Sequence, residues 1–181
     1  LPFGQPLIVS EKCLKVINEF KLVPEIQSFE CLFTSKGKGL EGLAREIACF
    51  SAFGEGLQLF ASFVMLLNFQ RYGRMKGMCQ IVTWSIRDET HHVESMIKLF
   101  HQLVKENPNI WTEKFKASIY QTARDMVDLE DKFIDLAFSM GGIRGLKAEE
   151  VKEYIRFIAN RRLTQLGLEP IYNCLLYTSD A

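Results

Sequence analysis

The sequence lacks an excess of charge of either sign. Its 22 lysines and arginines are balanced by 22 aspartates and glutamates, so the formal net charge of the 181 residues is zero. Proteins that coat nucleic acid carry a basic excess, so no nucleic-acid partner is expected. The five cysteines form no C-x-x-C pair, which favours free thiols in a reducing cytoplasm over a disulfide framework. No basic and apolar leader opens the chain, so a secretion signal is not expected either.

Proline and glycine are also scarce. With 5 prolines and 12 glycines, the chain has too few turn residues for a sandwich of many strands. Apolar residues recur at helical spacing instead, and short connections between helices make them antiparallel neighbours in an all-α bundle. The helices are expected over residues 40–72, 75–105, 112–139 and 147–167.

The two ends of the chain do not follow this pattern. Residues 1–40 form an N-terminal segment with one short expected helix, at 10–22. Residues 41–173 form the expected helical core. The last segment, 174–181, has neither a helical period nor a cap, and it is interpreted as a non-native tail.

One segment has the length and hydropathy of a membrane span. Residues 47–67 contain a single charged side chain, Glu55, and 21 residues are enough to cross a bilayer. A carboxylate near the middle of a bilayer is unfavourable, whereas a helix that is apolar on most sides is typical of the centre of a large soluble bundle. No membrane contact is therefore expected.

The helix expected over 75–105 has an apolar face that contains a carboxylate and an imidazole. Alternating steps of four and three residues average close to one helical turn, and they place Glu89 and His92 in the middle of this face. Burial of an unpaired carboxylate is unfavourable, so Glu89 needs a partner in the interior. The whole face comprises Met78, Val82, Ser85, Glu89, His92, Met96, Leu99 and Leu103.

The helix expected over 40–72 brings a second carboxylate to the same interior. Glu55 is the one charge on a face that otherwise comprises Ala44, Ala48, Ala52, Leu59, Ser62 and Leu66. Carboxylate oxygens and a neutral imidazole nitrogen suit iron or manganese, so Glu55, Glu89 and His92 are expected to bind a metal ion. In the alternative, the two glutamates lean to solvent or pair with the arginines at 45, 71, 74 and 87.

The spacing of Glu89 and His92 is typical of one kind of metal site. In di-iron carboxylate bundles, two helices each supply a lone Glu and two others each supply a Glu-x-x-His pair. This chain supplies one lone Glu, Glu55, and one Glu-x-x-His pair. The sequence therefore predicts half of a dinuclear site.

Longer motifs around these residues resemble a known family. EGLQLFASF at 55–63 and SIRDETHH at 85–92 look like the small (β, radical-generating) subunit of class I ribonucleotide reductase. The resemblance extends over residues 41–172, including the GGIRGL loop, and corresponds to the C-terminal half of that subunit. It implies a ferritin-like helical bundle, here partial, and a truncated fragment of an enzyme subunit.

The resemblance also implies roles for individual residues. Glu55, Glu89 and His92 would ligate one metal of a dinuclear iron centre, with Mn/Mn or Mn/Fe as alternatives. Asp88 would belong to the hydrogen-bonded chain that carries the radical to the large subunit. The implied function is oxygen activation, which creates the oxidant that the large subunit uses to make deoxyribonucleotides. The implied partners are that large (α) subunit and a second copy in a homodimer, and the implied location is cytoplasmic.

Other parts of the family pattern differ here or are missing. Phe63 and Leu59 match apolar residues around the site, with Leu59 standing where many members have Phe. The family's earlier helices bring a further Glu-x-x-His, but this chain has three histidines, at 91, 92 and 101, and no second pair. The isolated chain is therefore expected to be inactive.

Several alternatives remain beside the reductase. A stand-alone di-iron oxidase would share the fold, but it would not need Asp88 for a radical route. A non-enzymatic ferritin-like iron-binding bundle would need acidic cage-lining surfaces, which the neutral sequence does not show. A helical interaction module without metal is the remaining class. Outside the site, Trp84 is expected in the core, His101 at a helix end, and residues 129–135 on a solvated face.

Overall fold

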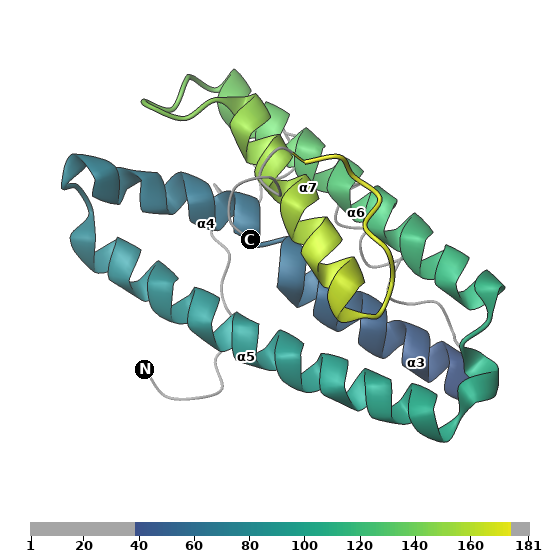
Figure 1. Ribbon diagram of the computed structural model, residues 1–181. Coiled ribbons are helices and arrows are strands. Elements are labelled where there is room, and N and C mark those ends of the chain that lie inside the picture. The colour runs from purple at the N-terminus through teal and green to yellow at the C-terminus, as the bar shows by residue number, and fades with distance from the viewer. Residues whose placement is uncertain (1–38, 175–181) are drawn as a thin grey trace, which may run out of the picture. The chain divides into compact units, whose positions relative to one another are not determined.

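The computed structural model describes residues 39–174, which contain helices and turns but no strand (Figure 1). The helix expected at 10–22 and all but the first residue of the expected tail lie outside the described residues. The elements are α3 (Leu40–Cys49), the π-helical turn η1 (Phe50–Glu55), α4 (Phe60–Leu67), the 3₁₀ turn η2 (Asn68–Tyr72), α5 (Lys76–Glu106), the 3₁₀ turn η3 (Pro108–Ile110), α6 (Glu113–Ser139) and α7 (Ala148–Gln165).

The α3–η1–α4 segment occupies the middle of this arrangement. On one side it packs along α5, and on the other side it packs against α6 and α7, which also pack on each other (Figure 1). Ala44, Ala48 and Ala52 are fully buried, as the sequence predicted, and their small side chains allow the helices to approach closely. The helix that carries Glu55 is therefore in contact with every long helix of the described chain.

Local signals place the ends of the long helices within about two residues of the prediction. Gly73 ends η2 in the left-handed conformation at φ 67°, where glycine carries no steric penalty. At the start of α6, the Thr112 hydroxyl accepts a hydrogen bond from the Phe115 N–H at 3.1 Å. At the start of α7, the Glu150 carboxylate accepts one from the Lys147 N–H at 2.9 Å. Such bonds satisfy backbone donors that a helix leaves free at its N-terminus.

The helix predicted over 40–72 has the predicted ends, but it is not regular throughout. The π-helical turn interrupts it at residues 50–55, and a turn at residues 58–59 precedes α4. A π turn accommodates an extra residue, so the faces of the helix after it are displaced by one position. Phe60 is accordingly buried, whereas the predicted Leu59 is 41% exposed.

The buried face of α5 shares Val82 with the predicted one, but its other residues each lie one position after a predicted residue. The buried residues of α5 are Cys79, Val82, Val93, Ile97 and Phe100. The expectation of buried Leu99 and Trp84 side chains is wrong, because these are 50% and 54% exposed on the face that turns away from the packed helices.

The stretch from Leu40 to Tyr72 is long and apolar enough, by length and composition, to span a membrane. In the described chain, 44% of its most apolar 18-residue segment is buried.

Candidate metal centre

Three side chains from two elements converge at the end of the π-helical turn. Glu55 is the last residue of η1, whereas Glu89 and His92 lie one turn apart on α5. One potential ligand atom from each residue lies within 4.8 Å of the other two. The Nδ1 atom of His92 is 3.7 Å from a carboxylate oxygen of Glu89. Within residues 39–174, no other group of three or more His, Cys, Asp or Glu residues converges in this way.

The site is only partly enclosed. Glu55 is half-buried, the Glu89 side chain is 23% exposed and the His92 side chain is 62% exposed. The expectation of an interior position is therefore wrong for His92, because the described residues leave most of its side chain exposed. Neither glutamate forms an ion pair with an arginine of the described residues. The alternative in which arginines neutralise the two glutamates is therefore not supported for this part of the chain.

A metal ion fits this donor set. Bonds of about 2.0–2.2 Å from a metal to carboxylate oxygen or imidazole nitrogen place two ligand atoms up to about 4.4 Å apart. Because a separation of about 4.4 Å applies only to ligands on opposite sides of a metal, side-chain rotations would bring the three atoms, now within 4.8 Å of one another, closer together to complete coordination. Two carboxylates and one imidazole without a thiolate are a donor set that suits iron or manganese.

The π-helical turn sets the position of Glu55 on the backbone. The Gln58 N–H donates to the carbonyl of Phe53 at 3.3 Å, a spacing of five residues. One turn earlier, the Ser51 hydroxyl donates to the carbonyl of Ile47 at 2.6 Å. Because π turns are rare and occur frequently at functional sites, this irregularity independently marks the segment that carries the glutamate.

A buried arginine on α7 holds the segment that follows the π turn. Arg162 is 2% exposed, and its Nε donates to the Gly56 carbonyl at 2.9 Å while its Nη1 donates to Gln165 Oε1 at 2.8 Å. Burial, reinforced by neighbouring Arg161, lowers the pKa of Arg162 to about 10, which leaves the guanidinium charged at neutral pH. The contact requires glycine, because a Cβ at Gly56 would lie 2.7 Å from the Arg162 Nε.

A buried glutamate on α6 reaches the start of α4. Glu130 is 5% exposed, and its carboxyl group forms a hydrogen bond with the backbone of Ala61, whereas Oε2 has no partner. The N-cap residue of α4, Leu59, provides no side-chain acceptor, so Glu130 satisfies a donor of the first turn from outside the helix. Desolvation raises the pKa of Glu130 to about 8; the Ala61 bond opposes this shift and Asp131 adds to it. Glu130 is therefore mainly protonated at neutral pH.

Sequence reasoning missed both of these residues. The expectation that residues 129–135 form a solvated face holds for Lys132 and Asp135, which are exposed. It is wrong for Glu130, which is buried, and Asp131 pairs with Arg156 at 2.6 Å. A signal was present in each case. Glu130 continues the spacing of buried Ala123, Met126, Val127 and Ile134, and Arg162 continues that of Val151, Ile155 and Ile158.

The other residues singled out from the sequence have mixed positions. Asp88 is exposed on α5 and makes no hydrogen bond or ion pair with a described residue, so its role in a radical route stays a prediction. Phe63 is 9% exposed in the core, in contrast to Leu59. His101 is more than a helix-end residue, because its Nε2 lies 2.7 Å from the Gln165 carbonyl and links α5 to the end of α7.

The chain matches a known protein family over most of its length. The family model described as ribonucleotide reductase, small chain, matches residues 9–175. The chain is 52% identical over 157 residues to a probable ribonucleoside-diphosphate reductase small subunit of Invertebrate iridescent virus 3. It is 29% identical over 161 residues to the ribonucleoside-diphosphate reductase subunit beta of Chlamydia pneumoniae. These matches cover 86% and 88% of this chain but 42% and 46% of the relatives, so the chain spans about half their length.

The fold leads to the same family. A putative class I ribonucleotide reductase from Bacillus halodurans matches the structure with a TM-score of 0.72 at 25% identity, covering 90% of this chain and 49% of that one. The expected all-α, ferritin-like bundle is thereby confirmed for the described residues. Sequence motifs, fold and family match agree, and the chain belongs to the ribonucleotide reductase small-chain family.

Proposed function

We propose that this chain is part of the radical-generating small subunit of a class I ribonucleotide reductase, in which Glu55, Glu89 and His92 bind one metal of a dinuclear centre. The convergence of their ligand atoms within 4.8 Å carries the proposal. When bound, such a centre, with iron as the expected metal, supplies oxygen activation and hence the oxidant for ribonucleotide reduction on the large subunit.

The chain's own residues hold the site and limit access to it. Glu55 and Glu89 offer oxygen ligands whose negative charge balances that of a cation. On the inner side of η1, the buried side chains of Ala52 and Phe53, with Phe63 of α4, exclude water from the core. Asp88, next to a proposed ligand, is the residue we assign to the hydrogen-bonded route toward the large subunit.

We further propose that the remaining ligands belong to parts of the full-length protein beyond this chain. Its relatives are about twice as long, and a dinuclear bundle site uses two Glu-x-x-His pairs where this chain has one. The exposed side of His92 is the side from which they would approach. A large subunit, a second copy in a homodimer and a cytoplasmic location complete the proposal.

Titration with Mn(II) tests the ligand assignment. The 181-residue chain is mixed with Mn(II), and the concentration of free Mn(II) is measured from its electron paramagnetic resonance signal, which falls as the ion binds. We expect one site per chain, and at least a tenfold higher Kd for Glu55→Gln and for Glu89→Gln, because each removes an anionic ligand. Glu94→Gln is the matched control on the exposed surface of α5. Unchanged binding by both ligand variants would contradict the assignment.

A further inference from the structure

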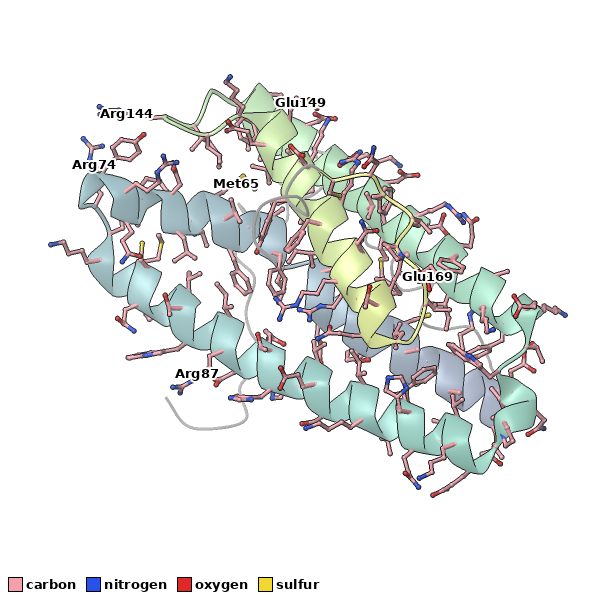
Figure 2. All side chains as sticks on the ribbon, in the orientation of Figure 1. Met65, Arg74, Arg87, Arg144, Glu149 and Glu169 are labelled. Atoms are coloured by element: carbon pink, nitrogen blue, oxygen red, sulfur yellow. The ribbon has the colours of Figure 1, made fainter. Side chains whose placement is uncertain are left out.

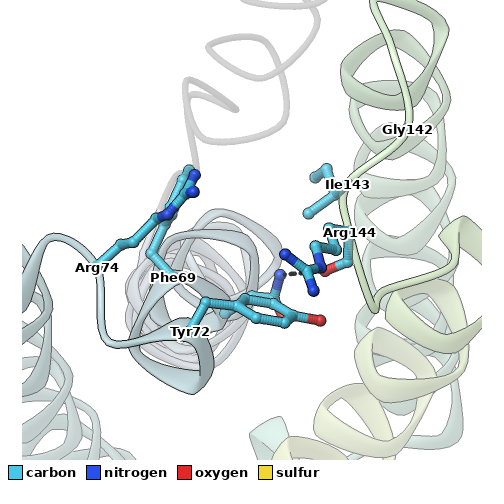
Figure 3. Close-up of a pocket in the computed structure, with 7 residues that line it drawn as sticks. Phe69, Tyr72, Arg74, Gly142, Ile143 and Arg144 are labelled. Atoms are coloured by element: carbon cyan, nitrogen blue, oxygen red, sulfur yellow. Dashed lines mark hydrogen bonds between the residues drawn. The ribbon is translucent and has the colours of Figure 1, made fainter.

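A separate pocket lies where η2 meets the loop between α6 and α7. Its volume is about 230 Å³, and its lining includes Phe69, Tyr72, Arg74, Ile143 and Arg144 (Figure 3). It shares no residue with the candidate metal centre. Figure 2 shows Arg74 and Arg144 at the same end of the described helices.

Hydrogen bonds to the backbone hold the walls of this pocket in place. Asn68 Nδ2 donates to the carbonyl of Arg144 at 2.9 Å, and Arg71 Nη1 donates to the carbonyl of Gly145 at 3.1 Å. Gly145 adopts φ 74°, and a Cβ at this position would overlap the hydroxyl of Tyr72. The loop is therefore fixed to η2 through its backbone, and the pocket does not depend on the rotamers of exposed side chains alone.

The pocket combines positive charge with aromatic surface. The guanidinium carbon of Arg144 lies 4.6 Å from the centroid of the Tyr72 ring, a stacking contact that orients the guanidinium. Arg74 stands on the other side of the pocket (Figure 3), and its side chain forms no hydrogen bond or ion pair with a described residue. The sequence contains no acidic residue between Glu55 and Asp88 or between positions 135 and 149. Two arginines thus line the pocket without a neighbouring carboxylate in either segment.

These features define the chemistry of a ligand. Guanidinium groups form paired hydrogen bonds to phosphate oxygens, and a phosphate monoester carries about −1.5 to −2 charges at neutral pH, which two arginines balance. Aromatic faces stack on flat rings. The volume is below the roughly 300–1,000 Å³ of sites that enclose a whole drug-sized ligand, so a single ring and one phosphate are the appropriate size.

We propose that this pocket binds a small phosphate monoester with a flat ring, the phosphate between Arg74 and Arg144 and the ring against Tyr72 and Phe69. The site is independent of the metal centre and of the reductase function proposed above. It assigns a purpose to the GGIRGL loop at 141–146, which supplies Arg144 and is fixed to η2.

Phenyl phosphate is the probe, because it is the simplest molecule with both features. Its binding to the 181-residue chain is compared by calorimetry with that of inorganic phosphate and of phenol. We expect phenyl phosphate to bind at least tenfold more tightly than either. Arg74→Gln and Arg144→Gln should each weaken it at least tenfold, whereas Tyr72→Leu should remove its advantage over inorganic phosphate.

The controls separate this pocket from general attraction of anions. Arg124→Gln removes an exposed arginine on α6 and should leave the affinity unchanged. Arg74→Gln removes no side-chain hydrogen bond or ion pair among the described residues, so it remains informative even if Arg144→Gln fails to fold. Equal affinities for phenyl phosphate and inorganic phosphate, or equal effects of Arg74→Gln and Arg124→Gln, would overturn the proposal.

Discussion

Replacing Arg162 tests whether the buried guanidinium holds the segment next to Glu55. Arg162→Met keeps much of the side-chain length but removes the donors to Gly56 and Gln165. Hydrogen bonds from a charged donor contribute about 1.5–3 kcal/mol each, so the loss of two amounts to about 3–6 kcal/mol. Methionine also avoids the desolvation that, together with neighbouring Arg161, lowers the pKa of Arg162 to about 10, a gain of about 3 kcal/mol. The free energy of unfolding should therefore fall by about 1.5 kcal/mol, and by no more than about 3 kcal/mol.

Arg162→Lys distinguishes the geometry of the guanidinium from its charge. Lysine keeps the charge and its desolvation, but a single ammonium cannot reproduce the planar fork that serves two acceptors. We therefore expect Arg162→Lys to be destabilised at least as much as Arg162→Met. The free energies of unfolding are measured by urea denaturation followed by circular dichroism. Arg161→Lys, which changes the exposed neighbour, should stay within about 0.5 kcal/mol of the parent chain.

The same variants connect the fold to the metal site. If Arg162 positions the segment that follows Glu55, both substitutions should raise the Kd for Mn(II) about tenfold under conditions where the chain is fully folded. A lysine variant that unfolds within about 0.5 kcal/mol of the parent and binds Mn(II) normally would refute the reasoning, because charge alone would then suffice.

Two further predictions concern Glu130 and the isolated chain. Because the pKa of Glu130 is raised, the folded chain retains a proton on Glu130 that the unfolded chain releases. The resulting contribution to the free energy of unfolding is complete below about pH 4.5 and is lost as the pH rises toward about 8. The whole change is about 5 kcal/mol. Urea unfolding at pH 5.5 and at pH 8 should therefore show the parent chain losing stability relative to Glu130→Gln, and a constant difference between the two proteins would contradict this. The isolated chain, exposed to iron and oxygen, should give no lasting radical signal in electron paramagnetic resonance, because it supplies one Glu-x-x-His pair where a dinuclear site uses two. Stoichiometric binding of two irons with a stable radical would show that this count of ligands is wrong.

The sequence alone identified the long helices and the three residues that converge at the candidate metal centre. The boundaries of α5, α6 and α7 follow from signals within a few residues of each end, such as the hydroxyl of Thr112 and the carboxylate of Glu150. Glu55 and Glu89 were recognisable because a carboxylate on an apolar helical face needs compensation wherever the helix packs. Their convergence needed only that the two helices be neighbours, which the structure shows.

Only the tertiary structure decided the irregular backbone and the burial of individual charges. A regular 3.6-residue period cannot reveal a π turn, because one added residue displaces every later position, as Leu59 and Phe60 show. Glu130 is buried against the backbone of α4, and Arg162 is buried against the Gly56 carbonyl. Both contacts come from parts of the chain that are distant in sequence. The apolar spacing around such a residue indicates the helix face that will be buried, but the backbone group that the charged side chain meets there is set by the packing of other helices.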